Sequence, residues 1–465
     1  MPPDESGAVA MTSTPAPQSG ATQPLRLHRW ADRRVVGVAI VAMASGFGQF
    51  GVIAALGDVA RDFGQVVQGG TIADQVGLSG TELGIGLAII RLASLGSLPL
   101  VGLADRFGRR SMLLATVSLG LAMTVAAAAS PSYWLFVAIF ACGRPLLSST
   151  NALTQLIAAE QTDARDRAAA VALVAAGYGV GAGLTAVIHS LASSVLGFRG
   201  IFALALVPLA ALPFLRRWIE EPDRFKIAAA AAEHPLPVIG PVGREFRRRL
   251  LVIAVIAFAV SAITGPANSF VFLYAQNVLH QPGYVTAAMV VGAGLAGLAG
   301  LLAGRWLADH LGRRPTGALA MIALALFGAL AYQGSRPALV LGYILGVMAG
   351  SVFAPAGGAL LAELFPTSVR ASVAGWWVAA GVLGAVFGLV AFGAVADVGN
   401  RFAVAAVVTF APAALAAGFF WLVPETRGKE PEDLWPALSH GTSDVDAGAS
   451  PEQPPGLGGD MGASR

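Results

Sequence analysis

The sequence predicts an all-α membrane protein in which twelve transmembrane helices form two pseudo-symmetric six-helix bundles. Of its 465 residues, 55% are hydrophobic and only 12% are charged, whereas soluble chains carry about 25% charged residues. The apolar residues gather in blocks of about 20, a length that crosses a bilayer as a helix. A charged motif that follows the second block returns after the eighth. These observations exclude a secreted, fibrous or nucleic-acid-binding protein.

Five segments follow one another along the chain. Residues 1–32 are rich in Pro, Ser, Thr and Gln and have no apolar core, which predicts a disordered cytoplasmic tail and not a signal peptide. We expect one six-helix bundle over residues 33–215 and a second over residues 250–428. Charged residues concentrate in 216–249, the expected cytoplasmic linker between the bundles. Residues 429–465 have the composition of a second disordered cytoplasmic tail.

Apolar blocks of membrane-spanning length predict the twelve helices. Internal prolines such as Pro145, Pro266 and Pro355 do not exclude a helix, because neighbouring helices can satisfy the backbone groups that a proline frees. The expected spans are about 35–56, 82–104, 112–130, 133–157, 168–191 and 199–215 in the first half, and about 250–275, 285–304, 316–333, 338–361, 372–395 and 402–423 in the second.

The distribution of basic residues predicts the orientation. With both termini in the cytoplasm, most of the 30 Lys and Arg residues fall on the cytoplasmic side, as the positive-inside rule requires. Basic loops beside anionic lipid also account for the pI of about 9.3. We therefore expect a monomeric, multi-pass protein of the plasma membrane. Its expected partners are the lipid bilayer and a small-molecule substrate, with no nucleic acid.

The sequence argues against an enzyme. A single cysteine, Cys142, excludes a disulfide framework and a cysteine-based metal site. The chain contains no His-Glu-x-x-His and no Gly-x-Ser-x-Gly motif. We expect no enzymatic activity, no cofactor and no bound metal. A solute sensor would carry a substantial further cytoplasmic domain, and the two tails are too short for one.

Two charged motifs occur once in each half of the chain. The first contains an aspartate, a glycine and two arginines, and the second contains a glutamate followed seven residues later by an arginine. The copies of the first motif are 204 residues apart and those of the second are 203 apart. Two motifs repeated at nearly one offset indicate a duplicated six-helix unit. The residues are Asp105, Gly108, Arg109, Arg110, Glu160 and Arg167 in the first half and Asp309, Gly312, Arg313, Arg314, Glu363 and Arg370 in the second.

With these motifs the sequence resembles the major facilitator superfamily of secondary transporters over about residues 33–428. Residues 363–370 and 424–428 are similar to motifs of its sugar-porter and metabolite–proton symporter branches. The resemblance implies the major facilitator fold and transport by alternating access, with proton symport as one form of coupling. It also implies that the charged residues of the two motifs form a cytoplasmic gate, which holds when the cavity opens outward and breaks when it opens inward.

Two arginines lie within predicted spans, Arg91 in the second and Arg144 in the fourth. An arginine at the centre of a transmembrane helix costs roughly 2.5–3.5 kcal/mol, so such residues usually face a cavity. No aspartate or glutamate lies in the middle of a predicted span. A bound anion could balance the two positive charges, which predicts an anionic metabolite as the substrate. Backbone carbonyls, or carboxylates reaching in from the helix ends, could balance them instead.

Polar residues in the first, fourth and seventh predicted spans complete the expected substrate site. Two of them follow Arg144 on one face of the fourth span, and the others belong to the first and seventh spans. The residues that we expect beside the two arginines are Gln49, Ser148, Asn151, Asn268 and Tyr274.

The sequence offers one candidate for proton coupling. A carboxylate embedded in the membrane, the usual proton carrier, is missing from the predicted spans. Histidine is the side chain that ordinarily changes charge near neutral pH, and His189, near the outer end of the fifth span, is therefore the candidate. Two alternative functions stay open, namely efflux of a hydrophobic or amphipathic compound and uptake of a neutral, sugar-like solute.

Overall fold

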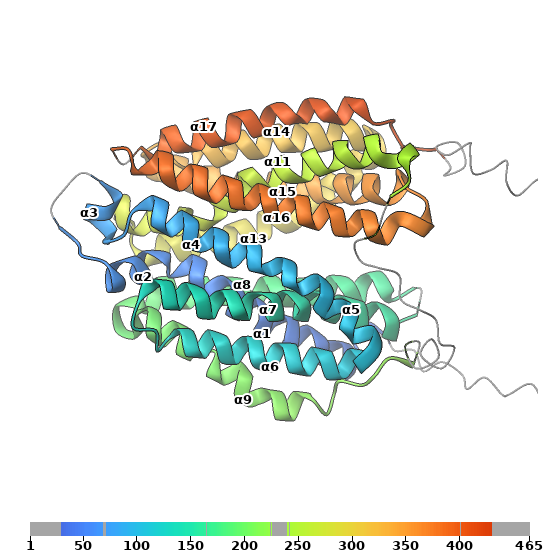
Figure 1. The fold of residues 1–465 in the computed structure, drawn as a ribbon, viewed down its shortest axis with the longest axis horizontal. Helices are drawn as coiled ribbons and strands as arrows, with labels where there is room; N and C mark the ends of the chain where they lie inside the picture. The colour runs from blue at the N-terminus through green and yellow to red at the C-terminus, as the bar shows by residue number, and fades with distance from the viewer. Residues whose placement is uncertain are drawn as a thin grey trace, which may run out of the picture.

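The computed structural model describes residues 29–429 except 68–70, 164, 224, 226–239, 241 and 400. The regular secondary structure of this part of the chain is helical, and the helices lie side by side in two groups (Figure 1). The predicted all-α fold class is therefore confirmed. Most of the two expected tails and part of the expected linker lie outside the described residues.

The first group comes from the first half of the chain. A short 3-10 turn, η1, interrupts the second predicted span, which therefore appears as α4 followed by α5. The elements are α1 (Arg33–Ala54), α2 (Leu56–Phe63), α3 (Ile72–Val76), α4 (Gly80–Ala93), η1 (Ser94–Gly96), α5 (Ser97–Phe107), α6 (Arg109–Ala127), α7 (Tyr133–Gln161), α8 (Arg167–Ala203) and α9 (Leu206–Leu215).

The second group comes from the second half. Its first span ends in a short π-helical segment, η3, in place of a regular α-helical turn. The elements are η2 (Arg244–Phe246), α11 (Arg247–Ser269), α12 (Val271–Leu273), η3 (Tyr274–Val278), α13 (Gly283–His310), α14 (Arg313–Leu330), α15 (Arg336–Glu363), α16 (Thr367–Asp397), α17 (Phe402–Leu415) and η4 (Ala416–Leu422).

Nine helices within the described residues are long and apolar enough to cross a membrane. The other three predicted spans correspond to α7, α14 and a helix that runs from the end of α8 through α9. Gly197 separates the fifth span from the sixth, because its φ of 57° breaks the regular helix there. The helices are therefore consistent with twelve crossings.

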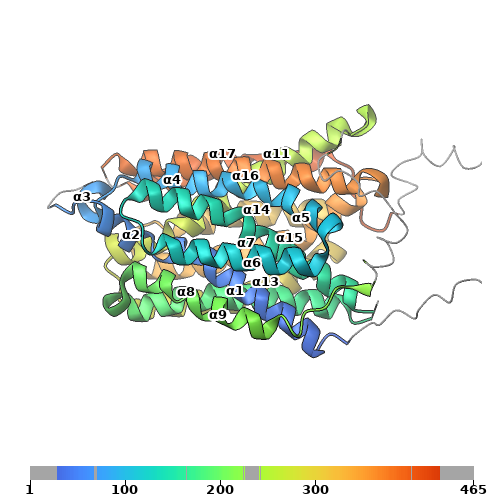
Figure 2. The same ribbon diagram turned by 60° about the horizontal axis from the view of Figure 1, so that its bottom comes forward.

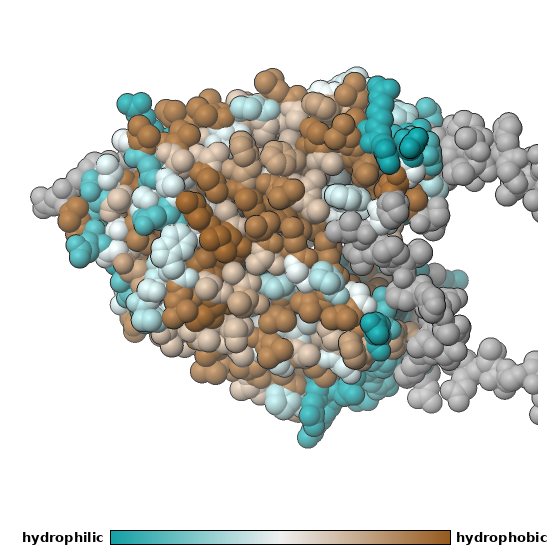
Figure 3. Space-filling model, viewed as in Figure 1, coloured by the Kyte–Doolittle hydropathy of each residue, from teal (hydrophilic) through white to brown (hydrophobic). Residues whose placement is uncertain are grey.

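The face of the bundle that Figure 3 shows is mainly apolar along the helices, and hydrophilic residues gather toward its two ends. Large hydrophobic side chains such as Leu295 of α13 and Phe387 of α16 are more than half exposed. A soluble protein rarely exposes apolar side chains over so wide a surface. The surface is therefore one that faces lipid along the length of the helices.

The two groups meet at one end of the bundle. The start of α1 and the end of η4 lie at the same end, which we name the terminal end; the opposite end is the distal end (Figures 1 and 2). A buried apolar cluster toward the distal end combines residues of both groups, such as Phe136 and Phe272. Two clusters nearer the terminal end each consist of residues from one group. The halves are therefore joined distally and separate toward the terminal end.

Glycines bring the two groups into backbone contact at the distal end. A Cβ atom on Gly84 of α4 would lie 2.6 Å from the backbone oxygen of Leu389 in α16. One on Gly393 of α16 would lie 2.2 Å from the backbone oxygen of Gly80. Only glycine, which has no Cβ atom, permits so close an approach. The distal end is closed by this contact between α4 and α16.

Candidate functional site

A cavity of about 310 Å³ lies between the two groups, on the terminal side of the distal contact. We name it the central cavity. Helices α1, α4, α7 and α8 of the first group line it, together with α11 and α16 of the second. Its volume is at the lower end of the range for small-molecule sites, about 300–1,000 Å³. The polar residues that line it are Arg91, Arg144, Tyr178, Thr264, Asn268 and Ser269.

Arg91 of α4 and Arg144 of α7 bring two guanidinium groups to this cavity. The Nε atom of each is buried and has no hydrogen-bond partner in the part of the chain that the structure describes. No aspartate or glutamate lines the cavity within the same residues. The cavity therefore presents concentrated positive charge, which favours an anion.

Tyr133 holds the two arginine-bearing helices together. Its hydroxyl group, on α7, donates a hydrogen bond to the backbone oxygen of Glu82 in α4 at 3.2 Å. A Cβ atom on Gly86 of α4 would lie 2.1 Å from the same hydroxyl oxygen. Glycine at position 86 therefore lets α4 and α7 approach closely enough for Arg91 and Arg144 to share one cavity.

The sequence does not single out Tyr178 of α8, yet this side chain lines the cavity beside the arginines. Glycines place α8 against α1. A Cβ atom on Gly46 would lie 2.1 Å from the backbone oxygen of Tyr178, and one on Gly181 would lie 1.9 Å from that of Met43. Small residues allow such close packing of membrane helices. The glycines around Tyr178 are visible in the sequence, but the direction of its side chain is not.

Asn268 of α11 lines the central cavity, with its amide nitrogen 3.0 Å from the backbone oxygen of Thr264. Gln49 does not line it. The Gln49 amide is buried in the first group, where it donates to Ser45 Oγ at 2.9 Å and to the backbone oxygen of Leu147 at 3.1 Å. The polar group of Gln49 thus joins α1 to α7 in this structure, and its contact with the substrate stays a prediction.

Tyr274 also lies outside the cavity, in an aromatic cluster at the distal end of the second group. Its hydroxyl donates to the backbone oxygen of Tyr332 at 3.1 Å and accepts from the N–H of Gly334 at 2.9 Å. Its ring packs against Tyr332 and Phe402. The hydroxyl of Tyr274 is thus engaged inside the cluster in this structure, and its contact with the substrate stays a prediction.

Ser148 and Asn151 lie one and two turns beyond Arg144 on α7, toward the terminal end. They do not belong to the lining of the central cavity. The side-chain oxygen of Asn151 accepts a hydrogen bond from Gln155 at 3.5 Å. Both residues are partly exposed, which places them between the cavity and the terminal end.

A charged network ties together the terminal end of the first group. Arg109 lies 2.6 Å from Asp105 and 3.1 Å from Glu160 of α7. Glu221 accepts hydrogen bonds from the first two backbone N–H groups of α6, at 2.6 and 3.1 Å. Gly108, with φ of 93°, precedes this helix, and a Cβ atom there would lie 2.9 Å from the Glu221 carboxylate. Glycine therefore makes room for the carboxylate that caps α6.

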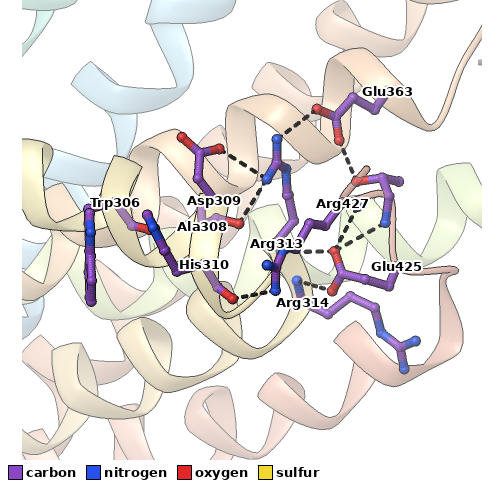
Figure 4. A network of polar contacts seen from close by, with 10 residues as sticks. Trp306, Ala308, Asp309, His310, Arg313, Arg314, Glu363, Glu425 and Arg427 are labelled. Carbon is purple, nitrogen blue, oxygen red and sulfur yellow. Dashed lines mark hydrogen bonds and ion pairs between the residues drawn. The ribbon is translucent and has the colours of Figure 1, made fainter. Parts of the chain in front are cut away.

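The second group repeats this arrangement (Figure 4). Arg313 lies 3.1 Å from Asp309 and 3.4 Å from Glu363 of α15. Glu425 accepts from the first two backbone N–H groups of α14, at 2.9 and 3.0 Å. Gly312, with φ of 110°, precedes α14 as Gly108 precedes α6. The duplication seen in the sequence is therefore also a duplication of contacts.

The other gate residues that the sequence suggests are all arginines. One of them, Arg167, is the first residue of α8. The remaining three donate to backbone oxygens: Arg110 to Arg216 at 3.1 Å, Arg314 to Phe420 at 2.9 Å and Arg370 to Phe365 at 3.4 Å.

These ion pairs are formed within each group, at the end where the two groups are separate. They are intact in a structure whose two groups are separate at this end, and the expectation that they act as a gate stays a prediction. Each pair joins neighbouring helices of the same group, so a movement of one group against the other leaves it intact. The networks therefore connect neighbouring helices at the terminal end of each half.

Glu425 lies outside the membrane-spanning helices, and its environment favours the carboxylate. Partial burial opposes ionisation, but hydrogen bonds from the backbone N–H groups of four residues together lower the pKa of Glu425 below its ordinary value. The negative charge is thus held at the positive end of α14 at neutral pH.

His189 lies at the distal end of α8, away from the central cavity. Its Nε2 atom is 2.8 Å from Oδ2 of Asp58 in α2. The sequence does not reveal this partner, because Asp58 lies beyond the first predicted span, on a short helix whose direction the apolar pattern does not specify.

Comparison with known proteins identifies the family. The model of the Major Facilitator Superfamily matches residues 38–332 and 289–444. The chain is 26% identical over 380 residues to a Cupriavidus pinatubonensis protein named "Probable 4-methylmuconolactone transporter". The matched region covers 78% of this chain and 86% of that protein.

Two solved structures show the same fold. The inward open conformation of the xylose transporter XylE from E. coli gives a TM-score of 0.67 at 19% identity and covers 87% of this chain and 98% of that one. The nucleoside transporter NupG gives a TM-score of 0.69 at 14% identity and covers 84% of this chain and 99% of that one. The chain belongs to the Major Facilitator Superfamily and is a secondary transporter that moves a small solute across a membrane.

Proposed function

We propose that the transported solute is a small organic anion and that Arg91 and Arg144 bind it in the central cavity. The observation that carries this proposal is the pair of guanidinium groups, which line one cavity without a lining carboxylate among the described residues. Uncompensated charge away from water is costly. A carboxylate between the two arginines would accept charge-assisted, bidentate hydrogen bonds and remove that cost.

The rest of the cavity supports a small and partly apolar anion. Leu87, Ile90 and Leu389 supply apolar walls, and Asn268 supplies a polar group from the opposite half of the molecule. A volume of about 310 Å³ suits a compact molecule such as a ring that carries one carboxylate. The relative named for 4-methylmuconolactone transport is consistent with a small organic substrate.

Basic residues support an orientation with the terminal end in the cytoplasm of the cell and the protein in the plasma membrane. The charged networks of Arg109 and Arg313 both lie at that end, as the positive-inside rule favours. In this orientation the distal end, which is closed in this structure, faces the outside of the cell. Alternating access then requires the distal contact to open and the terminal ends to approach each other around the same cavity. The cycle involves no covalent chemistry, and a single chain contains the whole cavity.

Matched pairs of acids and amides test the proposal. The melting temperature of the purified full-length protein is measured with benzoate and benzamide, and with acetate and acetamide. A ligand that binds the folded state raises the melting temperature, so the acids should do so and the amides should not. Arg144→Gln should abolish the shift, and Arg336→Gln, a change on the exposed distal surface, should keep it. Equal shifts with acid and amide, or with xylose alone, would favour a neutral solute instead.

A further inference from the structure

A buried histidine and a carboxylate form a pair at the distal end of the first group. The side chain of His189 is 1% exposed and that of Asp58 is 27% exposed, and the contact between them is 2.8 Å. The second ring nitrogen of His189, Nδ1, is buried without a hydrogen-bond partner among the residues described. His189 lies two turns beyond Ala182 of the cavity lining, roughly 10 Å along the helix axis. The pair is therefore distinct from the central cavity.

Both members of the pair adjoin residues that contact the second group. On the α2 side, a Cβ atom on Gly57 would lie 2.0 Å from the side-chain amide of Asn277 in η3. On the α8 side, the hydroxyl of Ser190 accepts a hydrogen bond from the Thr286 hydroxyl of α13 at 2.8 Å. The pair therefore lies directly behind the surface where the two groups meet.

Asp58 is the charged group that contacts His189. The other titratable groups on the helices that pack around His189 lie farther away or contact other residues. Helices α1 and α6 carry their charged residues at the terminal end. Those of α7 and α13 lie in the cavity or at the terminal end. The other titratable residues at the distal end of these helices and of α2 have these partners: Arg61 with the side-chain amide of Asn277, Asp62 with Arg199, Tyr133 with the backbone of Glu82, and Tyr284 with Arg336.

We propose that Asp58 and His189 bind the proton that couples to transport, and that binding it strengthens the closed distal end. The neutral ring donates Nε2–H to Asp58, which leaves the lone pair of Nδ1 free to accept a proton. The product is an imidazolium–carboxylate pair, in which the carboxylate offsets the cost of the buried positive charge. Asp58 reaches solvent and His189 does not, so the proton passes between water and the ring when the distal contact loosens.

The geometry links protonation to the closed state. The ion pair draws α2 and α8 together, and Gly57 and Ser190 then hold Asn277 and Thr286 of the other group in place. Loss of the proton weakens the attraction between α2 and α8, and thereby weakens the contacts of Gly57 and Ser190 with the second group. The inference depends on secondary transport but not on the identity of the solute.

Pulsed EPR on the full-length protein in nanodiscs tests the inference without any added substrate. Cys142 is replaced by alanine, and spin labels are attached to Ser132→Cys and Gln333→Cys, two exposed positions in distal loops of the first and second groups. The pH is raised from 5.5 to 8, the range in which histidine side chains commonly change charge. Over this range the ratio of short to long distances between the two labels should fall at least about threefold. His189→Gln and Asp58→Asn should each remove this pH response.

His280→Asn is the matched control, because His280 is an exposed distal histidine with a positive φ of 48°, which asparagine tolerates. This variant should keep the full response. A His189→Gln protein that folds and responds to pH like the parent overturns the inference. If His189→Gln does not fold, a folded Asp58→Asn protein that keeps the pH response overturns it instead. A parent protein without a pH response also overturns it. No anion is present, so these outcomes are independent of Arg91 and Arg144.

Discussion

Asp397, at the end of α16, accepts a hydrogen bond from the backbone N–H of Thr81, 2.8 Å away at the start of α4. The Thr81 hydroxyl and the Gly80 N–H donate to the same carboxylate. A side chain of the second group thus caps a helix of the first, where the helix dipole favours negative charge. Because the two helices belong to different groups, the contact lasts only while the distal end is closed.

Replacing Asp397 should shift the protein toward the conformation that is open at the distal end. Asp397→Ala removes three hydrogen bonds across the interface, and charge-assisted bonds contribute about 1.5–3 kcal/mol each before solvent exposure reduces them. The Ser132–Gln333 label pair should report a larger fraction of long distances. An unchanged distance distribution in a folded Asp397→Ala protein would show that the cap does not hold the halves together.

A large side chain at Gly84 should prevent the distal end from closing. Gly84→Leu places atoms where the backbone of Leu389 lies 2.6 Å from the Cβ position, so the label pair should stay at long distance and transport should fall at least about tenfold. Gly418→Leu is the control, since no atom lies within 4 Å of a Cβ at that exposed glycine of η4. Normal transport by Gly84→Leu would refute the close contact of α4 and α16.

Glu425 should give stability that depends on pH. The pKa of the folded state is below the ordinary value of 4.5, so its contribution is present above pH 4.5 and is lost as the pH falls through the lowered pKa. Glu425→Gln should lower the free energy of unfolding by about 1 kcal/mol at pH 7. Melting temperatures between pH 3 and 7 should show the difference from wild type shrinking in acid. A difference that is constant or grows in acid would contradict this sign.

The ion pairs of Arg313 should stabilise one half of the molecule without deciding which end is open. Arg313→Gln removes contacts to Asp309 and Glu363, both in the second group, so the melting temperature should fall by several degrees. The distal label pair should keep its wild-type distances. A change of the distance distribution at unaltered stability would instead support the gate that the sequence motifs suggest.

The sequence was sufficient to predict the fold because lipid imposes a simple rule, that each crossing needs about 20 apolar residues. It also predicted Arg91 and Arg144 as cavity residues, since an arginine in a span is costly wherever its helix packs. Gln49 and Tyr274 could not be assigned in the same way. Which face of a helix meets the cavity, and which backbone oxygen a polar group finds, depend on helix rotation that twelve nearly uniform apolar blocks do not encode.

The two capping carboxylates could have been found from the sequence. Glu221 and Glu425 are 204 residues apart, the same offset that separates Asp105 from Asp309. That agreement indicates that the glutamates belong to the repeated motif. Asp58 carries no such signal, because it has no equivalent acidic residue 204 positions later, where Ala262 lies in α11.

Uptake by proteoliposomes tests most directly whether the central cavity carries an anion between two moving halves. Purified full-length protein is reconstituted, and uptake of the tightest-binding labelled acid from the paired panel is measured against competition by the unlabelled acid and by its amide. We predict saturable uptake that the acid inhibits and the amide does not, and that falls at least about tenfold in Arg144→Gln. Equal inhibition by acid and amide, or full uptake by Arg144→Gln, would contradict anion transport through the central cavity.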